Sequence, residues 1–207
     1  MMLVSVGEVA SFQKGYPFRS EDYVSAGLKI IRVTNLNRNE YNDENCLFID
    51  ESKYDEYERF ALHKDDIVIS TVGSWPTNPL SVVGKVTIIP ERIEGCLLNQ
   101  NAVRIRAQRD CIQEFLIYVL LDESFKQYII GTAQGSAKQA SIKIEDIKRF
   151  EFELPPKEQQ IKMVSVLRSI DKRIELNNEI NDKLIEIRNT LLPAILSGDV
   201  DYEGIVL

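Results

Sequence analysis

The sequence of 207 residues is poor in the side chains that build metal sites and disulfide frameworks. It contains one histidine, His63, and three widely spaced cysteines, Cys46, Cys96 and Cys111. This set fits neither a zinc site nor a network of disulfides. No run of 18 apolar residues occurs, and the N-terminus lacks the basic start and apolar stretch of a signal peptide. We therefore expect a cytoplasmic protein that holds no metal and has no membrane partner.

Motifs for catalysis and for cofactor binding are also missing from the sequence. Gly73, Gly84 and Gly95 match neither the phosphate-binding loop of nucleotide hydrolases nor the dinucleotide-binding spacing. No Gly-x-Ser-x-Gly elbow is present, and one histidine leaves little material for a catalytic triad. The sequence thus predicts a protein that is not an enzyme and that needs no cofactor.

An excess of positive charge is lacking as well, since the formal net charge is −7. Residues 1–154 hold 18 Lys and Arg against 23 Asp and Glu, and residues 155–207 hold 7 against 9. Proteins that hold nucleic acid by bulk electrostatics are usually basic. A nucleic-acid binder of this composition must cluster its basic residues on one face or use positive surface from a partner.

Residues 1–154 carry the signals of a mixed β domain with one or two packed helices. Apolar or alternating segments bounded by turn residues predict strands at residues 28–33, 66–71, 82–89, 102–106 and 149–154. A helical face formed by Phe115, Tyr118, Val119, Phe125 and Ile129 predicts one helix over residues 113–130, with Gly131 as its stop.

From Lys157 onward the apolar spacing changes to that of one long helix, which gives a second part at residues 155–207. Pro155 and Pro156 suit its start, and Pro193 predicts an end or a kink near Leu192, about 54 Å from Lys157. A stripe this long cannot be buried by the helix itself, so a second copy or another protein must cover it. The expected seam consists of Val164, Leu167, Ile170, Ile174, Asn177, Asn181, Leu184 and Leu191.

Five stretches, in order, resemble one known family. They are residues 12–18, 66–74 and 98–101, then Leu154-Pro155-Pro156-Lys157-Glu158-Gln159-Gln160, and finally residues 191–198. The chain resembles the specificity subunit of Type I restriction-modification systems over nearly its whole length. The full subunit of that family has two target recognition domains and two conserved helices, whereas this chain has one of each. It is therefore similar to half a subunit.

The resemblance implies an α+β fold, with a mixed β-rich target recognition domain at residues 1–154 followed by a long C-terminal helix. It also implies that the helix forms an intermolecular antiparallel coiled coil, here in a homodimer. Such a dimer would read two identical, inverted half-sites of double-stranded DNA, that is, an interrupted palindromic target. The implied partners are methyltransferase (M) subunits, for which the chain acts as a scaffold, and a restriction (R) subunit.

The residues that read DNA are selected by their chemistry, because Arg and Lys suit guanine while Asn and Gln suit adenine. Polar loops of the β domain are the expected carriers. The selected residues are Lys14, Arg19, Asn35, Arg38, Ser74, Trp75, Asn78, Gln134, Ser136, Lys138, Gln139 and Lys143.

Plainer interpretations remain open for several polar residues. Trp75 can be a packed lid, Asn35 can be a turn residue, and residues 134–139 can be an ordinary surface loop. Arg104 and Arg106 can form the solvent face of a strand, and the pair Asp65-Asp66 can be a solvated turn.

Two other functions compete with DNA recognition. A non-catalytic assembly module would use the coiled coil and bind protein without sequence-specific DNA binding. An enzyme in its own right is the third hypothesis, and the lone histidine and the missing cofactor loop argue against it.

Overall fold

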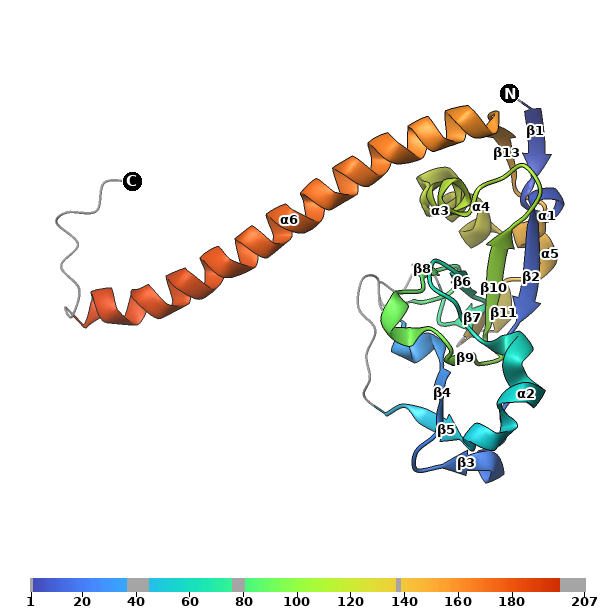
Figure 1. Ribbon diagram of the computed structural model, residues 1–207, viewed down its shortest axis with the longest axis horizontal. Helices are drawn as coiled ribbons and strands as arrows, with labels where there is room; N and C mark the ends of the chain where they lie inside the picture. Colours follow the sequence, from blue (N-terminus) through green and yellow to red (C-terminus); the bar gives the residue numbers. More distant parts are fainter. Residues whose placement is uncertain (1, 37–44, 76–80, 137–138, 198–207) are drawn as a thin grey trace. The chain divides into compact units, whose positions relative to one another are not determined.

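The structure, a computed structural model, describes residues 2–36, 45–75, 81–136 and 139–197. The chain divides into two units, Met1–Ile161 and Lys162–Leu207. The sequence-based boundary between residues 154 and 155 precedes this division, and it stays a prediction. A sheet-rich unit followed by a long helix confirms the predicted α+β class (Figure 1).

An antiparallel sheet with the order β2-β10-β6-β8 forms the middle of the first unit in the part of the chain that the structure describes. Its strands are β2 (Ala10–Lys14), β10 (Ala102–Ala107), β6 (Ile67–Ser70) and β8 (Val86–Ile88). Strand β8 is shorter than the predicted segment 82–89, because Gly84 adopts a positive φ of 72° in a turn just before it. The alternation of β10 buries Val103 and Ile105 on one face.

Helix α3 (Gln113–Leu121) packs against β8 and β10, and α4 (Glu123–Gly131) follows it. The prediction of one continuous helix over residues 113–130 was therefore wrong. Asp122 has extended backbone angles and ends α3. Its carboxylate then accepts a hydrogen bond from the backbone N–H of Ser124 at 2.9 Å, which caps the start of α4.

A second sheet has the order β3-β5-β4-β9 within the described residues, and it carries an aromatic cluster. Its strands are β3 (Tyr23–Val24), β5 (Leu47–Ile49), β4 (Leu28–Ile31) and β9 (Leu97–Leu98). The rings of Tyr16, Phe18, Tyr57 and Phe60 contact one another with centroids about 5 Å apart, and Phe18, Tyr57 and Phe60 belong to the core beside Ile30, Ile49 and Leu97.

Two smaller sheets complete the first unit. Strand β1 (Met2–Ser5) pairs with β13 (Glu151–Leu154), so the start of the domain lies beside its last strand. Strands β11 (Gln134–Ser136) and β12 (Gln139–Ser141) form a hairpin that pairs with β7 (Val72–Gly73). The short helices are α1 (Val6–Val9), α2 (Tyr54–Tyr57) and α5 (Ile144–Lys148), and 3-10 turns lie at η1 (Ser20–Asp22), η2 (Val33–Asn35), η3 (Glu51–Lys53), η4 (Glu58–Phe60) and η5 (Glu91–Ile93).

Helix α6 runs without interruption over Lys157–Leu196, 40 residues, or roughly 60 Å at 1.5 Å per residue. The helix does not end near Leu192, because it continues through Pro193 to Leu196, and the alternative of a kink at Pro193 stays a prediction. The carbonyl of Pro193 accepts a hydrogen bond from the N–H of Ser197 at 2.9 Å. Proline lacks an N–H and its ring crowds the carbonyl four residues earlier, so the disturbance falls on the turn before Pro193 and the turn after it can still form.

Candidate functional site

Backbone hydrogen bonds bring several polar segments to the end of the central sheet where β2 and β6 finish. Gly15 N–H donates to the carbonyl of Ala102 at 3.0 Å, and Thr71 N–H donates to that of Asn101 at 2.8 Å. Ile142 N–H, which follows the β11–β12 hairpin, donates to the carbonyl of Thr71 at 3.0 Å. We call this region the polar end, and its candidate residues are Lys14, Ser74, Trp75, Gln134, Ser136, Gln139 and Lys143.

Trp75 and the β11–β12 hairpin contact each other directly at the polar end. The indole N–H of Trp75 donates a hydrogen bond to the backbone carbonyl of Ser136 at 2.6 Å. The hydroxyl of Ser81 donates to the carbonyl of Ser74 at 2.5 Å. Two loops selected separately from the sequence are thus one structure, although 61 positions separate Trp75 from Ser136.

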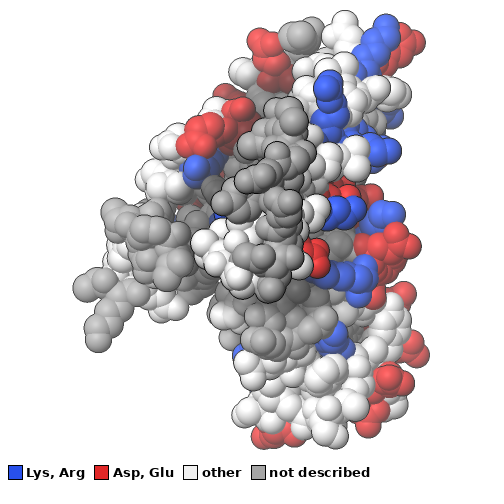
Figure 2. Space-filling model, turned by 90° about the vertical axis from the view of Figure 1, so that its left-hand side faces the viewer, with Lys and Arg blue, Asp and Glu red and all other residues white. Residues whose placement is uncertain are grey.

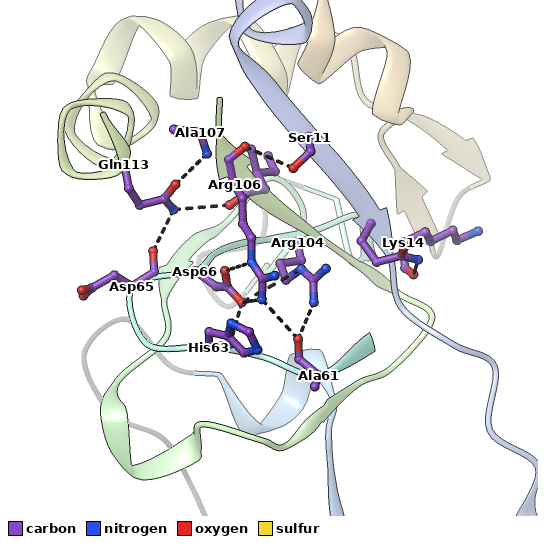
Figure 3. Close-up of polar contacts among 12 residues, drawn as sticks. Ser11, Lys14, Ala61, His63, Asp65, Asp66, Arg104, Arg106, Ala107 and Gln113 are labelled. Carbon is purple, nitrogen blue, oxygen red and sulfur yellow. Dashed lines mark hydrogen bonds and ion pairs between the residues drawn. The ribbon is translucent and has the colours of Figure 1, made fainter. Parts of the chain in front are cut away.

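Two lysines at the polar end have exposed side chains. Lys14 is the last residue of β2, and its side chain points away from the buried charges of the domain (Figure 3). Lys143 stands immediately before α5, one residue after the buried Ile142. Exposed ammonium groups of this kind can neutralise phosphate groups at little desolvation cost.

Other residues selected from the sequence are buried, lie in other segments or fall outside the described residues. Asn35 is only 2% exposed, and its side-chain oxygen accepts a hydrogen bond from Arg32 N–H at 3.1 Å within η2. It is the turn residue that the plainer interpretation expected, and it ends β4 earlier than predicted. Arg19 directly precedes η1 and pairs with Glu21 at 3.3 Å. Arg38, Asn78 and Lys138 lie outside the described residues.

Arg104 and Arg106 are not a solvent face, and Asp66 is not a solvated turn residue. The Asp66 carboxylate is 3% exposed and accepts hydrogen bonds from Arg106 at 2.5 and 2.8 Å and from His63 N–H at 2.7 Å (Figure 3). Arg104 lies 4.0 Å from the same carboxylate and donates to the carbonyl of Ala61. Burial, followed by the charge of Arg106, lowers the pKa of Arg104, while Asp66 raises it. The cluster joins β10 to the segment before β6 inside the domain.

The amide of Gln160 fixes the first turn of α6. Gln160 is fully buried, and its side-chain oxygen accepts a hydrogen bond from Ile112 N–H at 2.9 Å. Its side-chain nitrogen donates to the carbonyls of Asp110 and Pro155, both at 2.8 Å. In the sequence, Gln160 is only the last residue of the stretch Leu154–Gln160, and nothing in its neighbourhood marks it as buried.

The seam residues of α6 differ in exposure along the helix. Val164 is 6% exposed and Leu167 is half-buried, whereas the later members are exposed. Ile174 is 52% exposed and Leu184 is 57% exposed, values unusual for large apolar side chains in regular order. The exposed members are Ile170, Ile174, Asn177, Asn181, Leu184 and Leu191.

Charges on the surface are mixed. In the view of Figure 2, Lys and Arg side chains along the right-hand margin are interspersed with Asp and Glu side chains. Across the described residues, no group of three or more His, Cys, Asp or Glu side chains is arranged to hold a metal ion. No helix in the described ranges has the length and apolar content to cross a membrane.

The first unit is sheet-rich and presents polar side chains at one end of its central sheet, and the chain continues into the long helix α6. The family model of the Type I restriction modification DNA specificity domain matches residues 1–186. The chain therefore belongs to this family, and the sequence-based identification is confirmed. Members found by comparison are named specificity subunits, in agreement with the prediction of a non-catalytic component.

Two curated relatives illustrate the extent of the similarity. The MjaVIII specificity subunit of Methanocaldococcus jannaschii is 24% identical over 206 residues, which cover 98% of this chain and 47% of the relative. The EcoAI specificity subunit of Escherichia coli is 24% identical over 177 residues, which cover 84% of this chain and 28% of the relative. The chain spans about half or less of the length of these relatives.

Solved structures share the fold at low sequence identity. A chain from a study of the assembly of the type I R-M system has a TM-score of 0.68 at 17% identity, over 95% of this chain and 44% of that one. The S subunit from M. genitalium has a TM-score of 0.61 at 17% identity, over 96% of this chain and 46% of that one.

Proposed function

We propose that the chain is the sequence-specific DNA recognition subunit of a Type I restriction-modification complex and that each chain reads one half-site. The observation that carries the proposal is the meeting of separate polar segments at the polar end, through hydrogen bonds of Gly15, Thr71 and Ile142. Base edges are read by amides, hydroxyls and cations of this kind. Membership of the specificity-domain family supports the same assignment.

The net charge supports a complex in which partner subunits make part of the contact with DNA. A net charge of −7 and a mixed surface leave few lysines to grip phosphates, so a methyltransferase partner would supply much of that contact. The chain would then act as the scaffold on which methyltransferase subunits, and in the complete enzyme a restriction subunit, are placed on DNA. We assign this complex to the cytoplasm.

The second part of the proposal is a homodimer through α6. Six of the large apolar residues in the second half of the helix are at least 42% exposed: Ile180, Leu184, Ile185, Ile187, Leu191 and Leu192. A solitary helix of 40 residues with such a stripe is poorly stable in water, whereas a second helix would remove the stripe from solvent.

Charge favours an antiparallel arrangement of the two helices. In a parallel pair, each seam residue faces its own copy, so Arg188 would face Arg188. In an antiparallel pair centred near Glu179, Leu167 faces Leu191, Ile174 faces Leu184 and Asn177 faces Asn181. Arg188 then lies beside Ile170 and Asp171 of the other chain, where an opposite charge is available. A two-fold dimer of this kind reads inverted, identical half-sites separated by unread bases.

The phosphate contact of Lys143 tests the DNA-binding part. Lys143→Ala in the complex with its methyltransferase partner should weaken binding to duplex DNA and reduce the salt slope of the association constant by about 0.9. Lys126→Ala, on the exposed side of α4, is the matched control and should leave both unchanged. If the wild-type complex binds all sequences equally, an assembly module becomes the better description.

The dimer is tested by light scattering of the full chain. Leu167→Asp should convert the dimer to a monomer, because it places a charge in the seam opposite Leu191. Leu176→Asp changes an equally large residue, 46% exposed, on another face of α6 and should leave the dimer intact. A dimer that persists with Leu167→Asp refutes the coiled coil.

A further inference from the structure

The β11–β12 hairpin has one face made of amides and hydroxyls. Gln134 pairs with Ser141 and Ser136 pairs with Gln139, and directly opposite residues of an antiparallel pair share a face. All four residues are exposed, whereas Ala140 on the other face is 1% exposed. The polar face is therefore presented to solvent, while the opposite face of the hairpin buries Ala140.

Close packing holds the hairpin in this orientation. A side chain at Gly135 would place its Cβ 2.0 Å from the carbonyl oxygen of Gln139, so the two strands approach as closely as only glycine allows. Strand β12 pairs with β7 through Ala140 opposite Gly73, which fixes one edge of the hairpin to the domain.

The other edge of the hairpin is fixed by Trp75. Strand β11 is the edge strand of the sheet β11-β12-β7, and the carbonyl of Ser136 accepts the indole N–H of Trp75 at 2.6 Å. Since Trp has a single donor, the same N–H cannot also bind a base.

We infer that this hairpin is a reading ribbon that enters the major groove of duplex DNA, with the amides of Gln134 and Gln139 set for adenine. The major groove admits a two-stranded ribbon, and a Gln amide matches the N6 donor and N7 acceptor of adenine. The inference rests on the proposed DNA-recognition function and names the residues and the base class for it.

The two serines and Trp75 have distinct parts in this ribbon. The hydroxyl of Ser141 lies 3.3 Å from the carbonyl of Gln134 and donates to it, which leaves its oxygen as an oriented acceptor. Ser136 presents an exposed hydroxyl on the same face. Trp75 is a positioning residue that acts through the backbone of Ser136.

The test is selection of bound duplexes from a randomised DNA library by the complex of the full chain with its methyltransferase partner. The wild type should select a motif with adenine at the positions read by the ribbon. Gln134→Ala and Gln139→Ala should each relax the preference at one adenine by about tenfold and leave other positions unchanged. Gln159→Ala, an exposed glutamine in the first turn of α6, is the control and should keep the full motif.

Trp75→Phe separates positioning from base contact because it keeps an aromatic ring and removes the N–H donor. Without DNA, amide hydrogen exchange of the hairpin should quicken by about fivefold. With DNA, the preference should weaken only at the positions that respond to Gln134→Ala and Gln139→Ala. Equal weakening at every position, or exchange that stays unchanged while a different base loses its preference, contradicts the positioning role.

The outcomes distinguish this inference from the function on which it rests. A wild-type complex that selects no motif overturns both. A clear wild-type motif that survives unchanged in Gln134→Ala and Gln139→Ala overturns the reading ribbon and leaves DNA recognition to other residues of the polar end. A motif in which guanine replaces adenine at the responding positions overturns the base assignment.

Discussion

Replacement of Asp66 by asparagine should destabilise the first unit strongly, because it leaves two guanidinium groups without their carboxylate. Asp66 is 3% exposed, and the side chains of Arg104 and Arg106 are 12% and 32% exposed. An asparagine at this position keeps the size of the side chain and one acceptor for His63 N–H, so the change in free energy reports mainly the lost charge.

The magnitude follows from the burial of the partners that remain. Breaking a buried ion pair by removing one member costs about 3–5 kcal/mol. Because 32% of the Arg106 side chain is exposed, water can solvate the guanidinium in part when the carboxylate is gone. We therefore expect a loss of about 3 kcal/mol, at the lower end of this range. That is a large share of the total of about 5–15 kcal/mol typical of folded domains.

Urea unfolding of the full chain measures the effect. The midpoint should fall in Asp66→Asn with little change in slope, and a double-mutant cycle with Arg106→Gln should reveal coupling between the two side chains. Glu91→Gln breaks the exposed pair with Lys64, at 3.0 Å, and should leave the midpoint unchanged. A loss in Asp66→Asn no larger than in Glu91→Gln would refute the view of the cluster as a buried structural pair.

Two further predictions concern other buried groups. Gln160→Ala removes three hydrogen bonds and leaves the N–H of Ile112 without its acceptor, so it should cost about 2–3 kcal/mol in urea unfolding, whereas the exposed Gln159→Ala should cost little. Burial raises the pKa of the Cys111 thiol to about 11, so alkylation by iodoacetamide at pH 8, followed by mass spectrometry, should be at least about a hundredfold slower than for free cysteine. The folded thiol holds its proton more tightly than the unfolded thiol, so stability from this group should fall as pH rises from about 9 to about 11. Alkylation as fast as that of free cysteine would contradict the burial.

Local patterns predicted the secondary structure where neighbours along the chain decide it. The alternation in β10 and the three-four spacing of α6 both appear in the structure, because each reports which side of one element is apolar. The single helix over residues 113–130 failed because one capping residue, Asp122, outweighed a continuous apolar face. The end predicted near Leu192 failed because a proline lacks only its own N–H, so the turn after Pro193 still forms, with Ser197 N–H donating to the carbonyl of Pro193.

The candidate site could be predicted only in part. Polar chemistry alone identified Trp75 and the segment around Gln134, and the structure brings both to the polar end. The same chemistry also selected Asn35, which caps a turn, because a sequence does not distinguish an amide that faces water from one that faces its own backbone. Ser141 was missed, although the alternation of polar and small residues at 134–136 and 139–141 is typical of a hairpin with one polar face.

The sequence by itself determined the family, the order of a sheet-rich unit and a long helix, and the apolar stripe along that helix, because motifs and periodicity are properties of neighbouring residues. Only the tertiary structure decided which polar groups are buried and which are presented. The pair of Asp66 with Arg106 spans 40 positions, the bonds of Gln160 to Asp110 and Ile112 span about 50, and that of Trp75 to Ser136 spans 61. Contacts at such separations arise from tertiary packing, which the spacing of neighbouring residues in the sequence does not encode.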